Sequence, residues 1–388
     1  MGNRERVFET ITCNPQITRA RLAQLLGLPR TTVTGVITVL LDDGLIAEHA
    51  APHPAGRRGR PTTVLHATGA PRLVAAAVIT TSDVRVALLD YHASTWACRR
   101  AQLEVDDAEA VVRAAAGMVD ELVAELALDR PPELDRVVLG LPAPIRHGRG
   151  IPTFEITGCQ TETYSDGSEA NPDERQPRYA PWLAVDLAAL LRDHWHHRAV
   201  TENDANLGAL GELAFGAARG YTDFIYLKIS PHGFGAGLVL GGGLHRGTDG
   251  FAGEIAHLHV NDDGPLCRCG GRGCLSGVLG PALTENLNPP RSPRTGAAQD
   301  YRDPTRVFRA IGTTLGRFLA GTCTILNPQA IVLDADLAPH HDHVRHGITT
   351  ALRDHAAPVT THNLEIIAGT LPDAELAGAV ALARATTS

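Results

Sequence analysis

The chain has 388 residues, 20% of them charged and 44% hydrophobic, which fits a soluble globular protein with two or three folded units. A net charge of −8 excludes a protein that coats nucleic acid over its whole surface. Residues 1–61, however, hold eight Arg against five Asp and Glu, a local charge of +3 that leaves −11 for the remainder. A basic head on an acidic body favours DNA contact at one end.

The longest apolar runs are far too short to span a bilayer, and the first residues lack the apolar core of a signal peptide. We therefore expect a cytoplasmic protein with no membrane partner.

Residues 4–48 have the periodicity of three short helices. Thr18 is a suitable cap for the second helix and Gly27 a suitable end, while Pro29 fits the first turn of the third. The predicted buried face of the second helix is Leu22, Ala23, Leu25 and Leu26. A strand starting at 45–46, the Gly/Arg-rich segment 52–61 and a returning strand at 64–66 complete a predicted winged helix.

The third helix would enter the major groove of an operator, and its exposed residues would meet the base edges. The arginines of segment 52–61 suit a narrow minor groove. The alternative is a three-helix module for protein contact, which the basic bias disfavours. The predicted DNA-binding residues are Arg30, Thr31, Thr32, Thr34, Thr38, Arg57, Arg58 and Arg60.

Beyond residue 72 the pattern changes to that of an α/β protein. Two strands at 73–81 and 84–90 are echoed by a second pair at 224–229 and 235–242, which suggests duplication of one ββ unit. Between the pairs we expect a helix at 107–128, a buried strand at 137–145 and a strand at 199–201. Further helices are expected at 305–326 and 374–385.

Three of the seven cysteines are crowded together at Cys267, Cys269 and Cys274, close to His257 and His259. Three thiolates and one imidazole make a tetrahedral, structural Zn²⁺ site. The alternative, a surface loop with unpaired cysteines, is disfavoured by the density of Cys and Gly. Residue type alone does not choose between the two histidines, which would share one face of a strand.

The segments GTDGFAGEIAH (247–257), CRCGGRGC (267–274) and ENDAN (202–206) resemble the ROK family of repressors, open reading frames and sugar kinases. The resemblance covers nearly the whole chain. It implies two actin-like, ribonuclease-H-like α/β lobes with a sugar cleft between them, and it favours His257 as the zinc ligand. It also implies that Asn203, Asp204, Glu254 and His257 bind a sugar.

The resemblance further implies that the position of Asp204 is the general base in the kinases. This chain departs from them at both phosphate-binding loops. Val78 stands in place of an Asp, Thr80 and Thr81 in place of two glycines, and Pro231-His232 in place of a Gly-Thr pair. Such loops position and neutralise the transferred phosphate, so we expect no catalytic residue and only a vestigial base. Ser276 replaces a Glu that contacts sugar in the family.

The sequence thus predicts a winged helix at 1–68, a first lobe at 72–201 on which the C-terminal helix at 373–388 packs back, and a second lobe at 202–372. We expect a repressor of carbohydrate-related genes that binds a double-stranded DNA operator, responds to a sugar or sugar derivative, and forms a homodimer or homotetramer. The alternatives are an ATP-dependent sugar kinase with a DNA-binding appendage and a repressor that senses no sugar.

Overall fold

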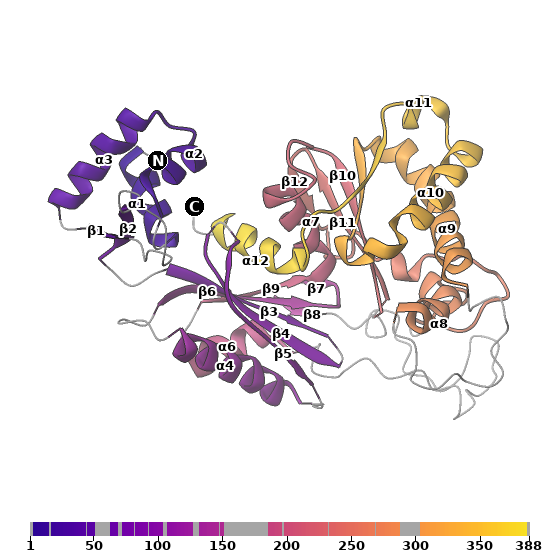
Figure 1. The fold of residues 1–388 in the computed structure, drawn as a ribbon. Helices are drawn as coiled ribbons and strands as arrows, with labels where there is room; N and C mark the ends of the chain where they lie inside the picture. Colours follow the sequence, from indigo (N-terminus) through magenta and orange to yellow (C-terminus); the bar gives the residue numbers. More distant parts are fainter. Residues whose placement is uncertain are drawn as a thin grey trace.

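The computed structural model describes residues 3–14, 17–43, 45–50, 63–68, 72–80, 82–91, 93–103, 107–126, 132–146, 148–150, 185–195, 198–231, 233–267, 269–287 and 303–385. Figure 1 shows the N-terminal helices at one end of the molecule and two α/β lobes beyond them. The predicted fold class, N-terminal helices with a two-stranded sheet followed by two actin-like α/β lobes, is confirmed, while the segment 52–61 of the predicted wing lies outside the described residues.

The N-terminal domain is a helical bundle with a two-stranded antiparallel sheet. Its core is formed by Ile11, Leu22, Ile37, Leu40 and Leu65, each fully buried. The elements are α1 (Asn3–Cys13), α2 (Arg19–Leu26), α3 (Arg30–Asp42), β1 (Ile46–Ala50) and β2 (Thr63–Ala67). The expectation that Leu25 is buried is wrong, because it is 39% exposed and lines a cavity of about 920 Å³ beside both lobes.

The first lobe is a five-stranded sheet of order β5-β4-β3-β6-β9, in which β3, β6 and β9 are parallel. Two helices, α4 and α6, cover one face of this sheet (Figure 1). The elements are β3 (Arg72–Ile79), β4 (Asp83–Leu89), β5 (Thr95–Gln102), α4 (Ala108–Glu125), β6 (Glu133–Leu141), β7 (Ile145–Arg146), β8 (Arg149–Gly150), α6 (Leu187–Trp195) and β9 (Ala199–Asn203).

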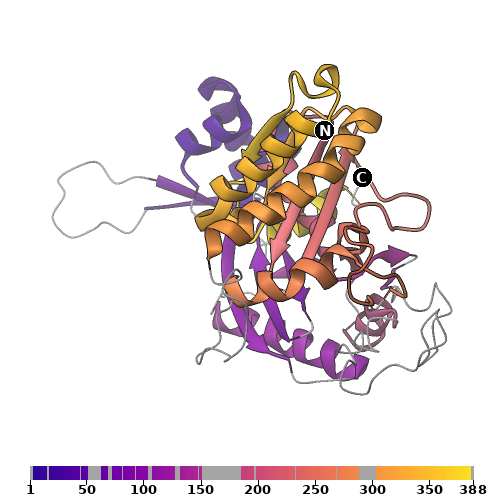
Figure 2. The same cartoon turned by 90° about the vertical axis from the view of Figure 1, so that its right-hand side faces the viewer.

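The second lobe repeats this design with a sheet of order β12-β11-β10-β13-β14. Helices α9 and α10 lie over its outer face, as Figure 2 shows. The elements are α7 (Asp204–Phe215), β10 (Phe224–Ser230), β11 (Gly233–Leu240), β12 (Gly243–His245), η3 (Ile255–His257), α8 (Leu275–Leu287), α9 (Pro304–Leu326), β13 (Ala330–Leu333), η5 (Ala335–His340), α10 (His341–His355), α11 (Pro358–Thr361), β14 (Glu365–Ala368) and α12 (Ala374–Ala385).

The two sheets have the same topology. In each, the first three strands form an antiparallel meander and the fourth and fifth strands run parallel to the first. This equivalence supports the duplication expected from the two strand pairs. The helix α7 begins directly after β9, the last strand of the first sheet, and so starts at the lobe junction.

Helices α7 and α12 pack together between the two sheets. Leu207 of α7 and Leu376 and Val380 of α12 share one core with the first sheet. The two helices approach so closely that a Cβ on Gly378 would lie 1.8 Å from the Leu207 carbonyl oxygen, and one on Gly211 would lie 2.2 Å from that of Ala374. The glycines therefore allow the backbones to touch. The predicted division at 201/202 falls inside β9.

Within the part of the chain that the structure describes, no single helix has the length and apolar character needed to cross a membrane. The helices α2 and α3 reach that length and apolar character only when they are taken together, and the angle between them is 117°.

We predict that Gly378→Ala destabilises the protein, since the added methyl group would force the α7 and α12 backbones apart. The expected loss is about 1–3 kcal/mol of unfolding free energy, measured by chemical denaturation. Gly117→Ala is the matched control, because a Cβ at this helical glycine of α4 meets nothing within 4 Å. The control is expected to be neutral or stabilising by up to about 1 kcal/mol. Equal stability of both variants would contradict the close contact.

Candidate functional site

The N-terminal domain contains a helix-turn-helix. The axes of α2 and α3 differ by 117°, within the range of DNA-binding motifs. The Thr18 hydroxyl caps α2 by accepting from the Arg21 backbone N–H, and Gly27 ends it in the left-handed conformation, with φ of 62°. A cap and a terminal glycine were both predicted from the sequence.

The exposed side of α3 carries the predicted base-reading residues. Arg30, Thr31, Thr34 and Thr38 are exposed, and Thr32 is half-buried. Val33, Ile37 and Leu40 fill the core beneath them. The Thr38 hydroxyl donates to the Thr34 carbonyl oxygen at 3.1 Å, so its hydrogen is already used within the helix. Arg57, Arg58 and Arg60 lie outside the described residues.

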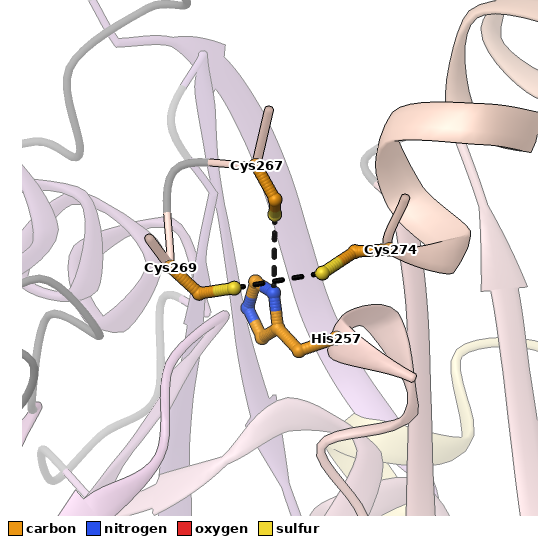
Figure 3. Close-up of side chains that lie close together, drawn as sticks. All are labelled: His257, Cys267, Cys269 and Cys274. Atoms are coloured by element: carbon orange, nitrogen blue, oxygen red, sulfur yellow. Dashed lines mark hydrogen bonds between the residues drawn. The ribbon is translucent and has the colours of Figure 1, made fainter. Parts of the chain in front are cut away.

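The predicted metal ligands come together at one point (Figure 3). One ligand atom from each of His257, Cys267, Cys269 and Cys274 lies within 4.8 Å of every other. The Cys267 Sγ atom lies 3.4 Å from His257 Nδ1, and Cys269 Sγ lies 3.5 Å from Cys274 Sγ. Donors around a tetrahedral Zn²⁺ at bond lengths of about 2.0–2.3 Å are separated by roughly 3.5–3.8 Å. The donor set therefore fits that ion.

The local fold distinguishes the two histidines. His257 ends the short helix η3 and faces the cysteines, whereas His259 pairs with Asp262 at 3.5 Å and is 55% exposed. The expectation that both lie on one strand is wrong, because the chain turns through η3 before the isolated bridge at His259.

A close backbone crossing holds the cysteine loop in place. A Cβ on Gly273, whose φ is 66°, would lie 1.6 Å from the Asn261 carbonyl oxygen, so only glycine fits. Hydrogen bonds from Cys269 and His257 lower the pKa of the Cys267 thiol. The Ser276 hydroxyl lies 3.7 Å from Cys267 Sγ, so the residue that replaces the family's Glu faces the cysteine cluster.

The predicted ligand-binding residues come from two segments at the lobe junction. Asn203 and Asp204 lie where β9 ends and α7 begins, while Glu254 directly precedes η3 and His257 is its last residue. The Asn203 side chain accepts from the Asn206 backbone N–H at 3.1 Å and donates to the Ala143 carbonyl oxygen at 3.1 Å. Asn203 therefore caps the start of α7.

Ion pairs connect the two segments across the lobes. Arg246, just after β12, pairs with the buried carboxylate of Glu202, and its Nε and Nη2 lie 2.7 and 2.6 Å from the same oxygen, Oε2. Arg146 of β7 pairs with Asp249 at 3.3 Å. These contacts hold the segment before Glu254 against the strand end that carries Asn203 and Asp204.

The stretch that corresponds to the first phosphate loop is closed on itself. The Thr80 hydroxyl oxygen accepts from the backbone N–H groups of Ser82 and Asp83, at 3.2 and 3.0 Å, and the Thr80 N–H donates to the Asp83 carbonyl oxygen at 2.8 Å. Val78 is buried in the core. The described amides of this turn, which a phosphate would need, are already satisfied. Thr81 lies outside the described residues.

The second loop is a tight hairpin. Ser230 of β10 pairs with Gly233 of β11, so only residues 231 and 232 connect the two strands. Phe234 is buried in the core of the second lobe, and the Thr284 hydroxyl donates to the Pro231 carbonyl oxygen at 3.3 Å. His232 lies outside the described residues.

Sequence reasoning missed a buried charge network that involves Asp204. The Lys228 ammonium donates to Asp204 Oδ2 at 2.8 Å and also to Glu375, which in turn pairs with Arg85 at 3.3 Å. A lysine inside an otherwise apolar strand was the available signal, because a charged residue is buried only with partners. The partner Glu375 lies 147 positions away in sequence, so no local pattern indicates it.

Asp334, at the end of β13, belongs to the same acidic region. It is 3% exposed, and burial together with the negative charge of Glu375 raises its pKa to about 7. The Asp334 side chain accepts a hydrogen bond from the Asp336 backbone N–H at 3.1 Å.

Comparison with known proteins gives consistent results. Residues 79–386 match the ROK family model. The xylose repressor of Bacillus spizizenii is 25% identical over 95% of this chain and 91% of the relative, and the repressor Mlc of Escherichia coli K12 is 24% identical over 93% and 87%. The glucokinase of Thermotoga maritima is 28% identical, but over only 53% of this chain and 72% of its own length.

Solved structures show the same fold. The crystal structure of a ROK family transcriptional regulator, a homologue of the Escherichia coli Mlc protein, superposes with a TM-score of 0.64 at 20% identity, covering 99% of this chain and 95% of the other. The ROK hexokinase from Thermus thermophilus gives a TM-score of 0.59 at 21% identity, covering 81% of this chain and 99% of the other.

We predict that Asp334→Asn stabilises the protein at pH 8. The pKa of Asp334 is about 7 in the folded protein and 3.8 in the unfolded chain. The contribution of this group to the free energy of unfolding is therefore fully present below pH 3.8 and is lost as the pH rises through 7. The variant should therefore gain roughly 1–3 kcal/mol over the wild type at pH 8, and the difference should shrink toward pH 4, as measured by denaturation. Asp342→Asn, whose side chain is 84% exposed, is the control expected to show no such trend.

Proposed function

Because this chain belongs to the ROK family and joins a helix-turn-helix to the two lobes, we propose that it is a transcriptional repressor whose operator affinity a sugar or sugar derivative controls. The observation that carries this function is the exposed side of α3, with Arg30 and Thr34 above a buried core. The repressor relatives extend over this N-terminal domain, whereas the glucokinase and hexokinase matches cover less of the chain. We propose carbohydrate-related genes as its targets.

The proposed partners follow from this function. The winged helix would bind double-stranded operator DNA in the cytoplasm, and a homodimer or homotetramer would present two recognition helices to half-sites about 34 Å apart. Asn203, Asp204, Glu254 and His257 would hold the sugar at the lobe junction. A ligand that changes the angle between the lobes would then change the spacing of the two recognition helices.

We further propose that the chain has no ATP-dependent activity and that Asp204 is a vestigial base. The self-closed turn at Thr80 supports this, because its described amides bond within the turn. The buried Val78 adds to it, since this position offers no carboxylate to a metal-bound nucleotide.

We predict that the purified protein enriches a palindromic site from genomic fragments at physiological salt, and that D-xylose or D-glucose alters its affinity for that site. Arg30→Ala and Thr34→Ala should each weaken binding about 10-fold, because each removes a contact to a base edge. Arg113→Ala, an exposed arginine on α4, is the matched control and should bind like the wild type. Failure to enrich any palindrome would overturn the repressor function.

We also propose that His257, Cys267, Cys269 and Cys274 hold one structural Zn²⁺. Elemental analysis should find about one zinc ion per chain, and Cys269→Ser should lose it together with several degrees of melting temperature. Cys98→Ser removes an exposed cysteine outside the cluster and should retain the metal. Undiminished zinc in the Cys269→Ser protein would reject the assignment.

A further inference from the structure

Lys228 is the only lysine in the sequence, since the other 34 of the 35 basic residues are arginines. It lies on β10, where Phe224 and Tyr226 on the same face of the strand pack toward α7. The one lysine of the chain therefore lies where the two lobes meet the helices α7 and α12, which we call the junction helices.

The Lys228 ammonium bridges two carboxylates from different helices. It lies 2.8 Å from Asp204 Oδ2, at the start of α7, and also contacts Glu375 in the first turn of α12. The three side chains are 12%, 15% and 5% exposed, respectively. The other Asp204 oxygen accepts from the Ala205 backbone N–H at 2.8 Å. Both oxygens of Asp204 are therefore fixed in place.

The chemistry of lysine suits this position. An ammonium is a compact point charge with three donors, whereas a guanidinium is a wide planar fork. Burial opposes the charged form, but the attraction of Asp204 and Glu375 raises the pKa of Lys228 above its ordinary value. Arg85 is the second cation of the network and pairs with Glu375 and Asp373. The negative charge of Glu375 is therefore compensated by Arg85 as well as by Lys228.

We propose that Lys228 is a positioning residue that sets the Asp204 carboxylate as an oriented hydrogen-bond acceptor for a ligand hydroxyl. This inference rests on the proposed sugar response and adds to it a residue that sequence motifs do not indicate. The Lys228 ammonium also occupies one lone-pair direction of the Asp204 carboxylate. A position that the kinases use for proton transfer thereby becomes a position for ligand binding.

The single lysine provides a direct spectroscopic test. Protein grown with lysine labelled by ¹³C at Cε gives one lysine side-chain signal, which reports on Lys228 without an assignment variant. We expect Asp204→Asn to shift this signal in the absence of sugar. We also expect D-xylose or D-glucose to shift it in the wild type but not in Asp204→Asn. A lysine with a purely structural role would give a signal that does not respond to sugar, and that result would overturn the inference.

Sugar affinity provides the second test. Because Lys228→Met alone would leave two buried carboxylates with one cation fewer, the double variant Lys228→Met/Glu375→Gln removes one carboxylate as well, and its melting temperature verifies folding. We expect it to bind the sugar at least 10-fold more weakly. Arg72→Met, which loses a half-buried pair with Asp135 in the first lobe, should bind like the wild type.

The outcomes separate the two proposals. Equal affinity of the folded double variant and the wild type would overturn the role of Lys228 and leave the sugar response intact. A wild-type protein that binds neither sugar would contradict the proposed sugar response, and the inference would fall with it.

Discussion

The architecture depends on the crossing of α7 and α12. Gly211 and Gly378 let the two backbones touch, at Ala374 and Leu207 respectively, and the first turns of both helices send carboxylates to Lys228. Each of these turns carries a carboxylate, Asp204 or Glu375, where the partial positive charge of the helix end favours it. Two carboxylates forced into one buried place require a cation, and Lys228 provides it. Loss of one partner from such a buried pair typically costs about 3–5 kcal/mol.

This crossing also explains why the C-terminal helix belongs to the first lobe although it follows the second in sequence. Leu376 and Val380 pack with Val74 and Val138 of the first sheet, while Ala374 and Gly378, on another face of α12, meet α7. The two lobes are therefore joined twice, by the β9–α7 connection and by the strand-to-helix return before α12. The helix α7 packs on strands of both sheets, and α12 reaches the second sheet through the Glu375–Lys228 ion pair.

Features whose signal is local could be predicted from the sequence. Thr18 and Gly27 mark the ends of α2, and three cysteines within eight residues mark the metal cluster. The strand β5, the helix α10 and the strand β14 were not predicted. β5 has an alternating but largely polar or half-buried pattern at the sheet edge, and β14 is only four residues long. The partners of Lys228 could not be predicted because they are 24 and 147 positions away and meet only through the crossing.

The charge network and the N-terminal domain border the same cavity, the one that Leu25 lines. Asp373, the partner of Arg85, forms part of that cavity wall, together with Phe215 at the end of α7 and Arg21 of α2. The walls thus come from the DNA-binding domain, the first lobe and both junction helices. Since no one of these bodies encloses the cavity alone, a change of angle between the lobes alters its shape. The exposed Leu25 of α2 therefore lies in a cavity wall that the helix supporting α3 shares with α7 and α12.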